Sequence, residues 1–212
     1  MSALWLSHLK QQRSIAVIRI PQFEWGVAMA KAVAAGGMTM IEITWNSDRP
    51  ASLIQRLRAE LPDCWIGAGT LLTIEMVQEA IAAGAQFLFT PHVNVELIQT
   101  AQAQQVPIVP GALSPTEIVT AWQAGATCVK VFPIQSVGGA SYLRHLHAPL
   151  GEIPLIPTGG VTLENAQDFL AAGAIAVGLG GQLFPAGAIA AQDWSAITQR
   201  VKTLRQTLER FV

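Results

Sequence analysis

The sequence predicts an α/β protein, a (β/α)8 TIM barrel formed by one domain over residues 1–212. Short apolar segments alternate with amphipathic helical ones almost without exception, which implies parallel strands joined by right-handed crossovers. One helix-ending pattern also recurs four times, which indicates repeated βα units. No low-complexity linker and no shift in composition divides the chain. A single domain of this length is ordinary for the fold.

Eight apolar segments are the candidate strands. Strands covered on both faces read as near-continuous apolar runs, and these segments do so: SIAVIRI (14–20), MTMIEITW (38–45), CWIGAGT (64–70), QFLFTP (86–91), VPIVPG (106–111), TCVKVFP (127–133), IPLIPTGG (153–160) and AIAVGLGG (174–181). The alternative is an open doubly wound sheet, which usually carries a glycine-rich phosphate loop after its first strand. RIPQFEWG has no such pattern, so the barrel is favoured.

Amphipathic segments between the strands predict the helices, and WSAITQRVKTLRQTLER (194–210) predicts the closing one. Thr73 is a candidate N-cap. Four segments end in a similar way, with glycine where a left-handed helix C-cap would place it: AAGG (34–37), AAGA (82–85), QAGA (123–126) and AAGA (171–174).

The composition excludes several classes of protein. The net charge is −1 without basic runs, which argues against a nucleic-acid partner. Only 13% of residues are charged, so we expect part of the surface to be buried in an oligomer. Cys64 and Cys128 lie in apolar stretches, as free thiols of a cytoplasmic protein do. The start, MSALWLSHLKQQR, lacks the features of a secretory signal.

One uncharged stretch, residues 169–192, is long enough to span a bilayer. It contains Gly178, Gly180, Gly181 and Pro185, which suit a continuous helix badly. We therefore expect a helix end, a buried strand and a glycine turn there, and no membrane partner.

Two charged residues in otherwise apolar strands are the candidate catalytic pair. Lys130 and Glu42 belong to the sixth and second strands, and alternate strands of a barrel fill a common interior layer. If both side chains point inward, they face each other across the mouth. Burial should lower the pKa of the lysine, and a neutral amine can attack a carbonyl while a carboxylate moves protons. A buried ion pair without a catalytic role is the alternative.

Two glycine pairs follow strands seven and eight, where such barrels often bind phosphate. Gly159–Gly160 and Gly180–Gly181 would let backbone N–H groups approach an anion closely. Ordinary tight turns are the alternative. The four histidines show no metal-site spacing, since His145 and His147 suit a surface helix end and His92 suits a turn. No metal or other cofactor is predicted.

Several ordered motifs, in register nearly end to end, resemble the bacterial 2-keto-3-deoxy-6-phosphogluconate (KDPG) aldolase family, which includes 4-hydroxy-2-oxoglutarate (KHG) and 2-keto-3-deoxy-6-phosphogalactonate aldolases. They are IAVIRI, IEITWNS, GAGTLLT, FTPHVN, VPIVPGALSPTE, KVFP, IPTGGV and GLGGQLF. The resemblance implies a metal-free class I aldolase of the Entner–Doudoroff pathway, usually a homotrimer, whose partners are small keto acids and phosphate-bearing substrates.

The resemblance also implies roles for individual residues. Lys130 would form the Schiff base and Glu42 would be the general acid–base. Thr70 would orient the pyruvate part of the substrate, and Pro91 and Phe132 would form walls of the pocket. Thr158, Gly159 and Gly160 would contact the substrate, and Gly180 and Gly181 would bind its phosphate.

The chain departs from the gluconate-type pattern at two positions. That pattern has an arginine, which helps to hold the keto acid carboxylate, where this chain has Asn46, and we expect Asn46 to be a substrate-binding residue in its place. The galactonate-type pattern has asparagine there and an arginine at the end of strand one, as Arg19 is here; Arg49 is the next candidate for the carboxylate. Gluconate-type members commonly have serine where Gly181 stands. Thr158, in contrast, resembles the gluconate type, and KDPG is the substrate we expect to be preferred, with weaker activity on KHG.

Two other functional classes remain open at this point. A phosphosugar isomerase or epimerase on the same barrel would use the phosphate site and Glu42, but it would leave Lys130 without a nucleophilic role. A non-catalytic barrel that binds a phosphorylated metabolite would keep Lys130 as a counter-ion.

Overall fold

The computed structural model describes residues 2–209, so Arg210 of the expected closing helix lies outside the described residues. Each expected strand segment contains an observed strand, and the fifth reaches into two. The strands are β1 (Ser14–Ile18), β2 (Met40–Thr44), β3 (Trp65–Gly69), β4 (Leu88–Phe89), β5 (Ile108–Val109), β6 (Gly111–Ala112), β7 (Val129–Val131), β8 (Leu155–Pro157) and β9 (Val177–Leu179).

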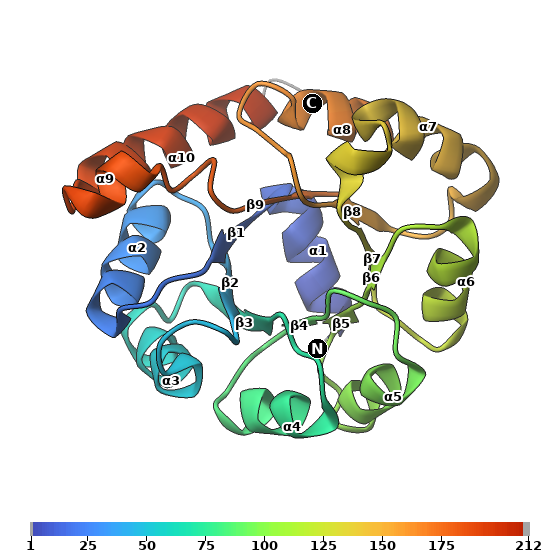
Figure 1. Cartoon of the computed structure of the whole chain (residues 1–212), viewed down its shortest axis with the longest axis horizontal. Helices are drawn as coiled ribbons and strands as arrows, with labels where there is room; N and C mark the ends of the chain where they lie inside the picture. Colours follow the sequence, from blue (N-terminus) through green and yellow to red (C-terminus); the bar gives the residue numbers. More distant parts are fainter. Residues whose placement is uncertain (1, 210–212) are drawn as a thin grey trace.

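All strand pairs are parallel, and they form a curled arrangement (Figure 1). One sheet has the order β5-β4-β3-β2-β1-β9 and the other has the order β6-β7-β8. Only Pro110 separates β5 from β6 along the chain. A single bridge between Thr158 and Gly178 links the end of β8 to β9.

Helices surround the curled strands (Figure 1). They are α2 (Phe23–Ala35), α3 (Pro50–Glu60), α4 (Ile74–Ala82), α5 (Val95–Ala103), α6 (Pro115–Gln123), α7 (Gly139–Leu150), α8 (Ala166–Ala171), α9 (Ala186–Ala190) and α10 (Trp194–Glu209), with a 3-10 turn η1 (Ile134–Val137). The Thr73 hydroxyl accepts a hydrogen bond from the Met76 N–H, which confirms the expected N-cap of α4. The four recurring glycines all have left-handed backbones, with φ of 89°, 90°, 96° and 100° at Gly37, Gly84, Gly125 and Gly173.

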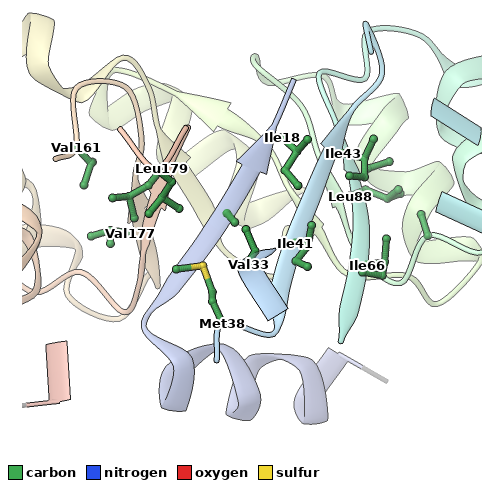
Figure 2. Close-up of a cluster of buried hydrophobic side chains, with 14 of the residues drawn as sticks. Ile18, Val33, Met38, Ile41, Ile43, Ile66, Leu88, Val161, Val177 and Leu179 are labelled. Carbon is green, nitrogen blue, oxygen red and sulfur yellow. The ribbon is translucent and has the colours of Figure 1, made fainter. Parts of the chain in front are cut away.

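Side chains alternate between two cores, as strand geometry requires. Ile41, Ile43, Val129 and Val131 pack outward against the helices, in the cluster that Figure 2 shows in part. Met40 and Cys128 belong instead to a second core on the concave side of the strands. Because side chains alternate along a strand, this division directs Glu42 and Lys130 to the concave side, which is the inward orientation considered from the sequence.

An N-terminal helix, α1 (Ser2–Gln12), lies in the centre of the ring of strands (Figure 1). Its Trp5 and Leu9 are fully buried in the concave core, next to residues near the strand starts such as Ile15 and Met40. The helix therefore covers the N-terminal ends of the strands, opposite to the ends where the predicted site residues lie.

The uncharged stretch 169–192 forms the end of α8, strand β9, a glycine turn and α9, as expected. None of the helices within residues 2–209 is long and apolar enough to cross a membrane. Cys64 and Cys128 are buried and free, as the sequence predicted.

Candidate active site

A cavity of about 580 Å³ opens at the C-terminal ends of the strands. Eleven of the twelve site residues predicted from the sequence line it: Arg19, Glu42, Thr70, Pro91, Lys130, Phe132, Thr158, Gly159, Gly160, Gly180 and Gly181. The exception is Asn46, which is exposed in the turn after β2 and is not among the lining residues. Almost all of the residues predicted from the strand ends therefore line a single cavity.

Lys130 lies in the middle of β7 and is paired with Gly111 on β6 and with Ile156 on β8. Its residue is only 7% exposed, and its Nζ lies 4.6 Å from the ring centre of Phe132 and 5.8 Å from that of Phe89. Two aromatic rings therefore flank an amine that borders the cavity.

Burial is the largest effect on the pKa of Lys130, and it lowers that pKa. The Glu42 carboxylate acts in the opposite direction, and the positive charge of Arg19 lowers the pKa further. A lowered pKa increases the fraction of neutral amine at a given pH, and the neutral amine is the nucleophile.

Glu42 lies on β2 and is only 2% exposed. Burial raises its pKa, while the positive charges of Lys130 and Arg19 oppose this shift. A carboxyl whose pKa is raised toward neutrality can both donate and accept a proton. The two groups thus have opposite pKa shifts with one main cause, their removal from water.

No ion pair or hydrogen bond joins Lys130 to Glu42 or to any other side chain in the described residues 2–209. The amine and the carboxyl are close enough to shift each other's pKa, yet they form no hydrogen bond or ion pair with each other. Charged groups that are buried without direct pairing are costly, so this arrangement indicates a site where both groups await a ligand.

Arg19 and Arg49 lie in different environments. Arg19 follows β1, lines the cavity and makes no ion pair with the carboxylates of the described residues. Arg49 does not line the cavity: its Nε lies 3.5 Å from Asp48, and its guanidinium stacks 4.3 Å from the ring centre of Phe23. Of the two arginines, Arg19 is the one placed to meet a ligand in the cavity.

Hydrogen bonds from the β2–α3 turn hold the segment that carries Arg19. The Ile20 N–H donates to Ser47 Oγ at 3.2 Å, and the Asp48 N–H donates to the Ile20 carbonyl at 2.9 Å. The Thr44 hydroxyl lies 3.2 Å from Ser47 Oγ. The motif NSD therefore fixes the backbone beside Arg19, which gives this turn a positional role even though Asn46 lies outside the cavity.

Thr70 has a left-handed backbone with φ of 60° at the end of β3. This conformation is rare for a β-branched residue and costs on the order of 1–3 kcal/mol. Such strain is characteristic of functional sites, and here it places Thr70 at the wall of the cavity.

The glycine pairs supply unpaired backbone donors to the cavity. Gly159 and Gly160 have φ of 86° and 90°, which other residues rarely adopt. Within the described residues, the N–H groups of Gly160, Gly180 and Gly181 donate to no backbone or side-chain acceptor. Unpaired backbone N–H groups beside a cavity are available to bind an anion.

Six further residues line the cavity although the sequence had not indicated them as site residues. They are Val17, Val161, Gly178, Gln182, Phe184 and Ile189. Strand alternation could have found Val17, because it shares a face of β1 with Arg19. Gly178 leaves room for Thr158, because a Cβ at Gly178 would lie 3.2 Å from Thr158 Cγ2 and closer still to its hydroxyl. The remaining four lie in loops or in the short α9, where no periodicity applies.

Within residues 2–209 there is no group of three or more His, Cys, Asp or Glu residues that could hold a metal ion. His145 and His147 are exposed on α7, and His92 lies in the turn after β4. The lining residues offer an amine, a carboxyl, a guanidinium, two threonine hydroxyls, a glutamine amide and backbone donors.

Known proteins resemble the chain over nearly its whole length. Residues 6–200 match the family model described as "KDPG and KHG aldolase". The chain is 36% identical over 190 residues to a 2-dehydro-3-deoxy-phosphogluconate aldolase of Treponema pallidum, which covers 90% of each chain.

Two solved structures have the same fold. The KDPG aldolase of Legionella pneumophila, with pyruvate captured as a covalent carbinolamine, has a TM-score of 0.85 and 30% identity, covering 91% of this chain and 93% of the other. The native structure of a protein designated KDPGal has a TM-score of 0.86 and 31% identity, covering 93% and 95%.

Proposed function

The chain belongs to the KDPG and KHG aldolase family, and we propose that it is a class I aldolase, a lyase that reversibly cleaves KDPG to pyruvate and glyceraldehyde 3-phosphate. The observation that carries this function is the unpaired, buried amine of Lys130 beside the Glu42 carboxyl in the cavity. An isomerase would leave Lys130 without a nucleophilic role, and a binding protein would use it only as a counter-ion, whereas an aldolase needs an amine placed beside a proton-transferring carboxyl.

The reaction begins when the neutral Lys130 amine attacks the keto carbon of the substrate. Glu42 donates a proton to the departing hydroxyl of the carbinolamine, and water leaves as the imine forms. The bond between C3 and C4 of the protonated imine then breaks: its electron pair flows to the imine nitrogen, giving an enamine, while the C4 hydroxyl gives its proton to the Glu42 carboxylate and C4 becomes the aldehyde carbon. Protonation of the enamine and hydrolysis of the imine release pyruvate and restore Lys130.

The other lining residues hold the two ends of the substrate. Arg19 binds the carboxylate of the keto acid, because a guanidinium matches a carboxylate with two donors, and Thr70 orients the same part. Pro91 and Phe132 wall the reacting carbons. The N–H groups of the glycine pairs receive the phosphate at the other end. KHG lacks that phosphate, so we expect weaker activity on KHG.

Borohydride reduction in the presence of pyruvate tests this function directly. Peptide mapping by mass spectrometry should find a reduced pyruvyl adduct on Lys130. If no adduct forms while the protein turns over a phosphosugar, the isomerase alternative would replace the aldolase, and if it neither forms the adduct nor turns over any substrate, the binding alternative would.

The keto acid carboxylate provides a test of Arg19. Replacing Arg19 by alanine should weaken pyruvate and keto acid binding by about 1.5–3 kcal/mol, the range for a hydrogen bond to a charged group. Arg49→Ala is the matched control, because Arg49 contacts Asp48 and Phe23 outside the cavity and should leave binding unchanged. Pyruvate affinity, measured from the concentration dependence of borohydride inactivation, decides between the two. Unchanged affinity in Arg19→Ala with a loss in Arg49→Ala would reverse the assignment.

The preferred epimer provides a test of Thr158, which is 9% exposed and lines the cavity. KDPG and its galactonate epimer differ at a hydroxyl-bearing carbon beside the cleaved bond, and a threonine hydroxyl can hydrogen-bond one configuration. We expect native kcat/KM to favour KDPG, and Thr158→Val to reduce that preference by roughly 10-fold, the value of one hydrogen bond. Equal native values for the two epimers, or an unchanged ratio in the variant, would rule out this role. Native values that favour the galactonate epimer would instead make the galactonate-type substrate the stronger candidate, in line with Arg19.

The assembly we propose is a complete (β/α)8 barrel of one domain, cytoplasmic, and present as a homotrimer. The bridge from Thr158 to Gly178 supports closure between β8 and β9, and the low content of charged residues, 13%, supports a surface buried between copies. Light scattering coupled to size-exclusion chromatography measures the number of chains.

A further inference from the structure

Two glycines leave the concave face of β3 without side chains. Gly67 and Gly69 are two residues apart and therefore face the same side, and their register partners on β2 are Glu42 and Thr44. Neither glycine has a positive φ, so the backbone conformation itself would accept an alanine. The reason for glycine at these positions has to be the space around them.

The space at Gly69 is occupied by the candidate acid–base. A Cβ added to Gly69 would lie 2.8 Å from Glu42 Cγ and still closer to the carboxyl carbon and Oε1. The carboxyl therefore lies directly over the Cα of Gly69, one strand across from its own backbone. Figure 1 shows β2 and β3 side by side.

The neighbouring space on the same face of β3 is also filled. The ring of the fully buried Phe87 occupies the corresponding space over Gly67. The Gly69 carbonyl accepts a hydrogen bond from the Trp45 N–H at 2.7 Å, which ties the backbone of Gly69 to the residue that follows β2. A methyl group at residue 69 would push the Glu42 carboxyl out of its place rather than shift the strand.

We propose that Gly69 is a positioning residue for the aldol reaction: the notch above its Cα, here called the Gly69 notch, holds the Glu42 carboxyl where it can exchange protons with the adduct on Lys130. This inference rests on the proposed function and adds a residue that acts through Glu42 without touching substrate. It also explains why GAGT has glycine at a strand position that no turn requires.

Kinetics of Gly69→Ala provide the first test, with Gly187→Ala as control because a Cβ at Gly187 meets nothing within 4 Å. We expect kcat for KDPG cleavage to fall about 100-fold or more in Gly69→Ala, the scale of a lost acid–base group, while borohydride still traps pyruvate on Lys130. In a Glu42→Gln background the same change should cost less than about 3-fold further. The proposal would be overturned if Gly69→Ala lowered kcat by the same factor in the native protein and in the Glu42→Gln variant, or if Gly69→Ala kept the native kcat.

Thermal melting tests the notch without any activity. Overpacking by one methyl should lower the Tm of Gly69→Ala by about 3–10 °C. Glu42→Ala empties the notch, so adding Gly69→Ala to that variant should change the Tm little. An equal loss of Tm in both backgrounds would mean that the methyl group added at residue 69 clashes with something other than Glu42. If this coupling is found in a protein without aldolase activity, the notch stands and the proposed function fails.

Discussion

Replacing Lys130 by arginine should abolish aldol cleavage, with kcat lowered roughly 10⁴- to 10⁶-fold, the scale seen when a catalytic nucleophile is removed. Arginine keeps the positive charge and approximate size, but its guanidinium stays protonated and offers no usable lone pair. The side chain ends at a cavity of about 580 Å³, so the larger head group has room and the chain should fold.

The measurements are kcat on KDPG and borohydride trapping with pyruvate, with circular dichroism to confirm folding. Lys202→Arg on the exposed side of α10 is the matched control and should retain native activity and the adduct. Substantial cleavage by a folded Lys130→Arg variant would take the nucleophilic role away from this residue.

The position of Lys130 could be predicted because two simple rules act together at strand ends. Side chains alternate between the two faces of a strand, so Lys130 points to the concave side if Cys128 does and Val129 packs against the helices. Parallel strands of a barrel then bring all their C-terminal ends to one side. Both rules apply to Glu42 as well, so the placement of the candidate catalytic pair at the cavity follows from local sequence and topology.

Other parts of the site follow no such rule. Asn46 lies in the turn after β2, where no periodicity fixes direction, and the structure leaves it exposed outside the cavity. Phe184 and Ile189 reach the cavity from the segment after β9, whose path depends on tertiary packing. The left-handed conformation of Thr70 has no sequence signal, because threonine is a residue that normally avoids it.

The helix α1 was not predicted as part of the core. Only Trp5 and Leu9 of its eleven residues are buried, which gives a weak periodic signal over a short segment. The space they fill exists only after the strands curl, so a core contact of this kind depends on the complete fold. The roles of Gly67 and Gly69 depend on neighbours in the same way, because a glycine in a sequence does not show which side chain will occupy its empty side.

Replacing Glu42 by glutamine should lower kcat by about 10²–10⁴-fold, the typical contribution of a general acid–base. Glutamine has nearly the same shape, so it should fill the Gly69 notch without a clash and leave the fold intact. Its amide cannot deliver or accept the proton that moves as the carbinolamine loses water. Imine formation on Lys130 should therefore continue, but slowly.

The same substitution has a second, electrostatic consequence at Lys130. The Glu42 carboxylate opposes the effect of burial and raises the pKa of Lys130, so a neutral side chain at residue 42 should lower that pKa further. Because only the neutral amine attacks, the low-pH limb of borohydride trapping should move to lower pH in Glu42→Gln, while kcat falls at every pH. Glu152→Gln, at an exposed turn, should change neither quantity. A native kcat in Glu42→Gln would move the acid–base role elsewhere, whereas a low kcat without the pH shift would mean that the carboxylate does not influence the Lys130 amine.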